Sequence, residues 1–242
     1  MFPLYDDNPF RLPVRPIVTW LLILANLMMF IVEFRGGDAT AQALVDAFGI
    51  TPTALLGGSF AATPAPVLTL LTYMFLHADA WHLLGNMVFL WVFGDDIEEA
   101  LGRGRFLLFY LICGIVGALA FVASDPTFPG PLIGASGAIS GIVIAYVMFR
   151  PCAKITVLLS IIPLRISAVW VIGAFVLTQF LSLESTGKSN VAYWCHLGGM
   201  LAGGVLFPLM RLPGVQLFEC VPRPHYPGEP AAAGPPDREP GG

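Results

Sequence analysis

The chain has 242 residues, of which 56% are hydrophobic and only 12% are charged. Soluble domains carry about 25% charged residues, so a soluble protein of this size would lack the charged surface that it needs. Twelve Lys and Arg against sixteen Asp and Glu give a net charge of −4, which argues against nucleic acid as a partner. With a mean hydropathy of +0.77, the composition excludes disordered chains and coiled coils and predicts an integral, multi-pass membrane protein in contact with the lipid bilayer.

Six stretches without Asp, Glu, Lys or Arg are candidate membrane-spanning helices, each of which needs about 20 apolar residues. In chain order they are Pro16–Val32, Ala80–Gly94, Phe106–Ser124, Pro126–Phe149, Ile166–Leu183 and Ser189–Met210. A further uncharged stretch, Ala47–Ala78, holds several prolines and a glycine pair, which break helices. We therefore expect this stretch to be a long loop that dips into the membrane interface.

The positions of the basic residues predict the orientation, because cytoplasmic loops are enriched in Lys and Arg. With six spans and a cytoplasmic N-terminus, only Arg35 and Lys188 lie outside. The cytoplasmic set is Arg11, Arg15, Arg103, Arg105, Arg150, Lys154, Arg165, Arg211, Arg223 and Arg238. A seventh span would move every later loop to the opposite side of the membrane and so destroy this distribution of basic residues. The sequence thus predicts an all-α polytopic bundle of six transmembrane helices with both termini in the cytoplasm.

Three regions follow from this division. Residues 1–15 form a cytoplasmic N-terminal segment, and residues 16–211 form the membrane domain. The first apolar run is longer than a signal-peptide core, so we interpret it as an anchor helix rather than a cleaved signal. Residues 212–242 are rich in Pro and Gly without apolar periodicity, which is typical of a disordered tail.

The four cysteines, Cys113, Cys152, Cys195 and Cys220, show no CxxC spacing. We therefore expect neither a structural disulfide nor a zinc site. An H-E-x-x-H motif is also absent from the sequence, and we expect no metal and no cofactor.

Polar residues inside the spans are costly and usually mark function. His82 and Asn86 are four residues apart, so on a helix both project from one face and can donate hydrogen bonds toward one point. A polar pair that joins two helices would show the same spacing.

His196 precedes Gly199 and Gly203, a G-x-x-x-G pair that allows another helix to approach at backbone distance. A packing helix with an incidental histidine is the simpler interpretation. An unpaired imidazole in a membrane is expensive, however, and close packing would bring it against a partner.

The sequence Gly134-Ala135-Ser136-Gly137 suggests that partner. Prolines end the preceding loop, so we expect a helix to begin near Ser136, where free backbone N–H groups favour negative charge. Gly137 and Gly141 form a second close-packing pair. Ser136 alone could be an ordinary N-cap. Together with His196 and the His82–Asn86 pair, it supplies a nucleophile, a base and oxyanion donors, which predicts a Ser–His dyad.

These motifs resemble those of the rhomboid family of intramembrane serine proteases, in the order His77-x4-His82-x3-Asn86, Gly134-Ala135-Ser136-Gly137 and His196-x2-Gly199-x3-Gly203. The resemblance extends from about Pro16 to Arg211. It implies a six-span core that hydrolyses peptide bonds in or near transmembrane helices of single-span or multi-span membrane-protein substrates.

The resemblance also implies the roles of the residues. Ser136 would be the nucleophile and His196 the general base, with His82, Asn86 and the Ser136 backbone N–H around the oxyanion. His77 would support the first loop. In the best-known bacterial members a tyrosine four residues after the nucleophile stacks under the base, whereas this chain has Ser140 there.

Other functions fit the sequence less well. Neither Gly37-Asp38 nor Gly94-Asp95 completes the G-x-G-D motif of aspartyl intramembrane proteases. A transporter would show internal repeats. A non-catalytic rhomboid-like protein that binds membrane clients is the alternative, although such relatives commonly lack the serine or histidine that this chain retains. The style of the motifs suggests a bacterial inner membrane.

Overall fold

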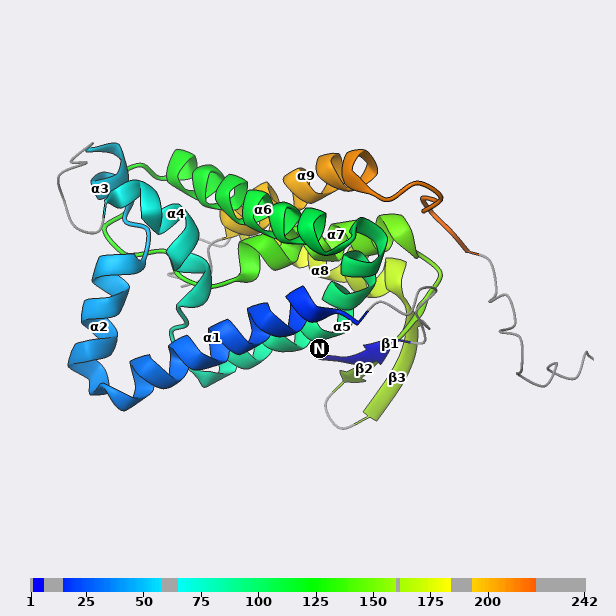
Figure 1. Cartoon of the computed structure of the whole chain (residues 1–242), viewed down its shortest axis with the longest axis horizontal. Coiled ribbons are helices and arrows are strands. Elements are labelled where there is room, and N and C mark those ends of the chain that lie inside the picture. Colours follow the sequence, from blue (N-terminus) through cyan, green and yellow to red (C-terminus); the bar gives the residue numbers. More distant parts are fainter. Residues whose placement is uncertain (1, 7–14, 58–64, 160–161, 184–192, 221–242) are drawn as a thin grey trace, which may run out of the picture.

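The computed structural model describes residues 2–6, 15–57, 65–159, 162–183 and 193–220. The protein is mostly helical, and a small sheet lies at one end of the helices (Figure 1). The long helices are α1 (Ile17–Arg35), α2 (Gly37–Phe48), α5 (Ala80–Leu101), α6 (Arg103–Ser124), α7 (Ser136–Phe149), α8 (Ala168–Leu183) and α9 (Tyr193–Met210). Short helical turns precede α5, namely α3 (Pro52–Leu56), η1 (Pro66–Leu68), α4 (Thr69–Thr72) and η2 (Tyr73–Phe75).

Helices α1, α6 and α9 are long and apolar enough to cross a membrane. The segment Pro66–Phe75 and α5 pass the same test together as a pair bent by 82°, which makes up to four candidate spans. Helices α7 and α8 are apolar but shorter, and α7 begins at Ser136, within the expected Pro126–Phe149 span. These helices make the protein an integral membrane protein of mostly helical structure.

The expected loop at Ala47–Ala78 is more ordered than the sequence suggested. Its described part contains the short turns α3, η1, α4 and η2, and Ile50 forms a β-bridge with Leu132. The bend before α5 ends at Asp79, whose Oδ1 accepts hydrogen bonds from the backbone N–H groups of Trp81 and His82, both at 2.8 Å. This N-cap fixes the start of the helix that carries His82 and Asn86.

Helix α1 lies along α5 and is fastened to it by a buried carboxylate (Figure 1). Glu98 Oε1 accepts from Val18 N at 3.0 Å, and Oε2 accepts from Thr19 N at 2.7 Å and Thr19 Oγ1 at 2.9 Å. Pro16, the N-cap residue, provides no side-chain cap. Glu98 therefore satisfies the free N–H groups of α1 with a charge of the sign that a helix N-terminus favours.

A three-stranded antiparallel sheet corrects the expectation of an all-α fold. Its order is β1 (Phe2–Asp6), β2 (Lys154–Leu159) and β3 (Ile162–Ser167). Ile166, expected to open the fifth span, lies in β3, and α8 begins at Ala168. The strands are short, and β1 pairs with a segment far away in the chain, so no local periodicity revealed them.

Strand β1 packs against the C-terminal part of α5, where Asp6 and Asp96 lie close to Tyr146 and Arg150 at the end of α7. The Tyr146 hydroxyl donates to Asp6 Oδ2 at 2.5 Å, and Arg150 Nε lies 4.0 Å from Asp96 Oδ1. Burial raises the pKa of the Asp6 carboxyl above its ordinary value.

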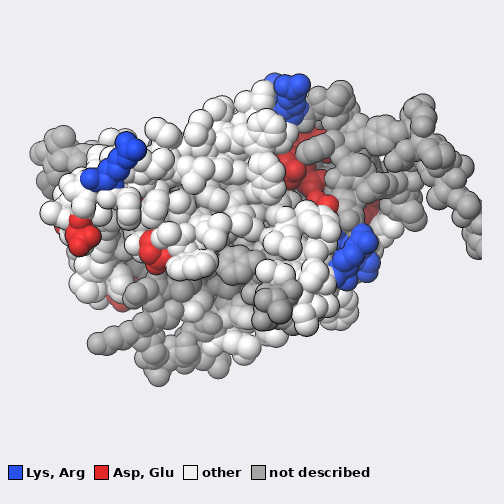
Figure 2. Space-filling view, turned by 90° about the horizontal axis from the view of Figure 1, so that it is seen from below, with Lys and Arg blue, Asp and Glu red and all other residues white. Residues whose placement is uncertain are grey.

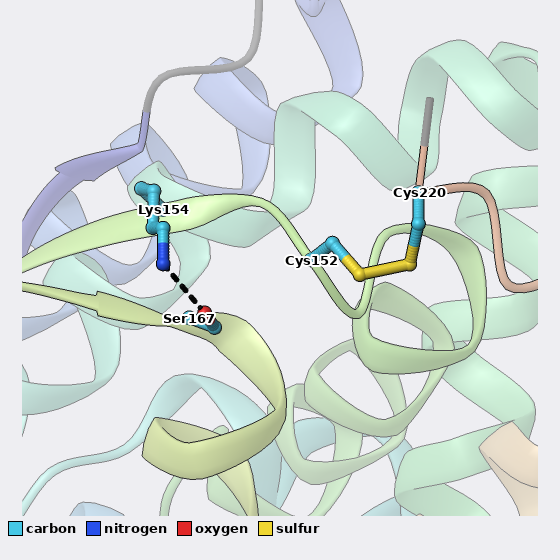
Figure 3. The surroundings of a disulfide bond; sticks show 4 residues. All are labelled: Cys152, Lys154, Ser167 and Cys220. Atoms are coloured by element: carbon cyan, nitrogen blue, oxygen red, sulfur yellow. Dashed lines mark hydrogen bonds between the residues drawn. A yellow bond between two sulfur atoms is a disulfide. The ribbon is translucent and has the colours of Figure 1, made fainter. Parts of the chain in front are cut away.

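A disulfide between Cys152 and Cys220 contradicts the expectation that the cysteines are unpaired (Figure 3). The backbone N–H groups of Phe218 and Glu219 donate to the carbonyls of Met148 and Phe149, which brings Cys220 back to the end of α7. The two cysteines are 68 residues apart, and a contact at that separation leaves no spacing motif. Leu212 to Cys220, assigned to the tail, are thus packed on the helices, and residues 221–242 lie outside the described residues.

The charged side chains are sparse on the surface seen from below in Figure 1. Figure 2 shows them toward the two ends of that face, and the described residues between them are mostly uncharged. Large apolar side chains of α1 are exposed, among them Leu21, Leu24, Met28 and Val32. A mostly uncharged surface with exposed apolar side chains is what contact with lipid requires.

Candidate active site

Ser136 is the first residue of α7, at the end of this helix that is farther from the sheet. Gly134 precedes it with φ of +116°, a backbone conformation that other residues rarely adopt, and its N–H donates to the Tyr73 carbonyl at 2.9 Å. The N-cap is Ala135, and no side chain caps the helix. The Ser136 hydroxyl is therefore not used as a helix cap, which removes the ordinary interpretation of this serine.

His196, in the first turns of α9, meets Ser136. His196 Nε2 lies 2.8 Å from Ser136 Oγ, and His196 Nδ1 lies 2.7 Å from Gln179 Oε1 of α8. The imidazole is buried, with 8% of the residue exposed. The structure thus brings together the predicted nucleophile and the predicted base in hydrogen-bond contact.

Two glycine pairs explain why these side chains meet. A Cβ at Gly199 would collide with the carbonyl oxygen of Gly137, and a Cβ at Gly203 would collide with that of Gly141. Helices α7 and α9 therefore touch at backbone distance along two successive turns. Because Ser136 adjoins the first of these contacts and His196 lies one turn from it, the backbone approach sets the distance between the two functional groups.

His82 and Asn86 point over Gly134 from α5. A Cβ at Gly134 would lie 2.8 Å from His82 Nε2 and 3.7 Å from Asn86 Nδ2. Asn86 Nδ2 is buried and has no hydrogen-bond partner among the described residues. The absence of a side chain at Gly134 allows His82 and Asn86 to approach the backbone two residues before Ser136, and their side-chain nitrogens converge there.

His77 and two aromatic residues complete the surroundings. The ring of the buried His77 packs edge-on against His82, with centroids 5.1 Å apart, so it supports the ring of His82. The rings of Phe175 and Tyr193 lie near His196, with centroid distances of 6.5 and 6.3 Å. Within the described residues, no group of three or more His, Cys, Asp or Glu could hold a metal ion.

Gln179 and Tyr73 were not among the predicted site residues. Gln179 carries the one amide side chain in the apolar stretch Ile166–Leu183, and that exception was the available signal. Tyr73 acts through its backbone carbonyl, which holds Gly134, and its hydroxyl donates to the Gly114 carbonyl at 2.7 Å. A backbone contact of this kind leaves no pattern in a sequence.

Comparison with known proteins gives one consistent result. A family model described as Rhomboid domain matches residues 64–212. The chain is 32% identical over 206 residues to the rhomboid protease GluP of Bacillus subtilis, covering 84% of this chain and 37% of that protein. It is 30% identical over 140 residues to the mitochondrial Rhomboid protein 1 of Saccharomyces cerevisiae (53% of this chain, 38% of that protein). It is 28% identical over 161 residues to the mitochondrial RHOMBOID-like protein 12 of Arabidopsis thaliana (59% and 46%). The chain therefore spans less than half the length of these curated relatives.

Proposed function

We propose that this chain, which belongs to the rhomboid family, is an intramembrane serine protease with a catalytic dyad of Ser136 and His196. Its substrates would be membrane proteins, cleaved in or near their transmembrane helices. The observation that carries the proposal is the distance of 2.8 Å from Ser136 Oγ to His196 Nε2 at the start of α7. The Ser136 hydroxyl does not cap its own helix, so the N-cap interpretation of this serine does not account for the contact.

The proposed reaction follows from the geometry. His196 Nε2 takes the proton of Ser136 while Oγ attacks the peptide carbonyl, and the imidazolium then protonates the leaving amine. The carbonyl oxygen becomes an oxyanion beside Gly134, where His82 Nε2, Asn86 Nδ2 and the Ser136 N–H would be its donors. Water then attacks the acyl-enzyme by the same steps and restores Ser136.

The unpartnered Asn86 amide supports this assignment of the oxyanion site. A buried N–H without an acceptor costs about 1–3 kcal/mol, and a developing negative charge would satisfy it only during the reaction. Replacing Asn86 with Ala should therefore lower kcat by about 10²–10³ with little change in KM.

The proposed membrane arrangement has six spans in residues 16–211 and both termini in the cytoplasm. The basic residues of the sequence support it, and they would place the sheet and Arg150 on the cytoplasmic side and Ser136 toward the outer side. We propose the inner membrane of a bacterium as its location. A reporter fused after residue 211 that is active only outside the cytoplasm would contradict this orientation.

The dyad is tested with purified protein and a model single-span substrate. Ser136→Ala and His196→Ala should abolish cleavage, whereas Ser124→Ala, a matched change at the end of α6, should leave it intact. Ser124 Oγ only donates to the carbonyl of Phe121 in its own helix. Binding of the substrate without cleavage by the wild type would instead support the alternative, a non-catalytic protein that binds membrane clients.

A further inference from the structure

Gln179 contacts the side of His196 that faces away from Ser136. Its Oε1 lies 2.7 Å from His196 Nδ1, and Gln179 is buried, with 5% of the residue exposed. The contact joins α8 to α9 at the one imidazole nitrogen that the dyad leaves unused. The family motifs contain no residue at this position, so the role of Gln179 has to come from its contacts.

The neighbours of Gln179 determine which way its amide points. Nε2 donates to the Phe175 carbonyl at 3.2 Å and to Thr178 Oγ1 at 3.2 Å. A carbonyl can only accept, so the opposite orientation would set two acceptors against each other. Thr178 Oγ1 itself donates to the Phe175 carbonyl at 2.6 Å, which leaves its lone pairs for Gln179. Oε1 is therefore the atom that faces His196.

The direction of the amide fixes the proton on the imidazole. Because Oε1 accepts only, His196 Nδ1 must carry the hydrogen, and the lone pair of the neutral ring is then on Nε2. Nε2 faces Ser136 Oγ at 2.8 Å, so this tautomer is the one that can take the proton of the serine. The other tautomer would point a hydrogen at Ser136 and two acceptors at each other across α8 and α9.

We propose that Gln179 is the positioning residue of the active site, a neutral third member that holds His196 in its reactive tautomer and orientation. The inference rests on the proposed protease function. A carboxylate would perform the same task in a soluble triad. An amide accepts the same hydrogen bond without the cost of a buried negative charge at membrane depth. Gln179 also holds the imidazole of His196 in a protein that has the small, buried Ser140 where other family members have a tyrosine ring under the base.

The experiment compares Gln179→Leu, which keeps the size and removes the acceptor, with Gln179→Glu, which restores an acceptor and adds charge. Gln42→Leu is the matched control, because Gln42 lies on α2 and bonds only to Asp46 of the same helix in a surface pair. Each protein is assayed for kcat and KM on a single-span substrate across pH 5 to 9, with its thermal unfolding midpoint. Ser136→Ala sets the background.

Gln179→Leu should lower kcat at least about tenfold with KM nearly unchanged, because one tautomer-selecting hydrogen bond is lost. Gln179→Glu should recover much of kcat and move the acidic limb of the pH profile upward by about one unit or more, since a carboxylate stabilises the imidazolium. A role limited to joining α8 and α9 would change the unfolding midpoint without moving the pH profile.

The outcomes separate the two hypotheses. Equal cleavage by the wild type and Ser136→Ala would overturn the protease proposal and this inference with it. Cleavage that needs Ser136 but is unchanged in Gln179→Leu, or an unshifted pH profile in Gln179→Glu, would overturn only the role of Gln179. If Gln179→Leu fails to fold, the pH profile of Gln179→Glu still decides.

Discussion

Gly199→Ala tests whether the backbone contact between α7 and α9 sets the geometry of the dyad. A Cβ at this position would overlap the carbonyl oxygen of Gly137 and lie 2.8 Å from its carbonyl carbon. Neither atom belongs to a side chain that could turn away, so the two helices must separate by roughly 1 Å. His196 moves with α9 and Ser136 with α7, and a displacement of that size costs on the order of 10² in rate.

The matched control is Gly204→Ala on the same helix, where a Cβ would meet only Ile144 Cγ2, at an ordinary 3.6 Å. Cleavage of a single-span substrate and thermal unfolding are measured for both variants. We expect Gly199→Ala to lose about 10² in kcat and about 1–3 kcal/mol of stability, and Gly204→Ala to resemble the wild type. Equal activity of the two variants would refute the argument that the glycine pair sets the Ser136–His196 distance.

Three further predictions concern the stability of the fold around the candidate site. Glu98→Ala removes the acceptor of three hydrogen bonds at the start of α1, so the free energy of unfolding should fall by at least about 1.5–3 kcal/mol, and Glu98→Gln should fall between it and the wild type. The Cys152–Cys220 disulfide joins residues 68 positions apart. Its reduction should lower the free energy of unfolding by at most about 4 kcal/mol and lower the thermal unfolding midpoint accordingly. A Cys152→Ser, Cys220→Ser double variant should not respond to reductant. The raised pKa of Asp6 means that the folded state binds its proton more tightly, so this contribution to stability is present at low pH and is lost as pH rises through the folded pKa. Between pH 4 and 8 the thermal unfolding midpoint of Asp6→Asn should therefore fall less than that of the wild type. The same pH dependence of the midpoint in both proteins would contradict this.

The sequence predicted the parts of the site that lie in local patterns. His82 and Asn86 share one helix face at a spacing of four, and the glycine pairs of α7 and α9 repeat at the same spacing. Those spacings indicated which helices approach and which side chains face inward. The start of α7 near Ser136 followed from the prolines before it, and the helix begins there.

The sequence did not predict contacts that join distant segments. Strand β1 pairs with β2, and Cys220 reaches Cys152, only because the folded helices bring the two ends together. The short strands also have no hydrophobic face long enough to show a period of two. Gln179 was missed for a different reason: an amide in an apolar helix is visible in the sequence, but its partner is set by how α8 packs on α9.

The polar groups of the membrane helices differ in what completes their hydrogen bonds, and that difference links the fold to the proposed chemistry. Glu98 and Asp79 accept hydrogen bonds from backbone N–H groups at the starts of helices, so their role is to stabilise the fold. Gln179 is satisfied by His196 and its own helix, which orders the side chain that we propose as the general base. Asn86 Nδ2, over Gly134, has no partner in the described part of the chain, although burial makes such an amide costly. Because it lies close to Gly134, beside Ser136, we propose that an oxyanion formed by attack of Ser136 on a substrate completes its hydrogen bonds during the reaction.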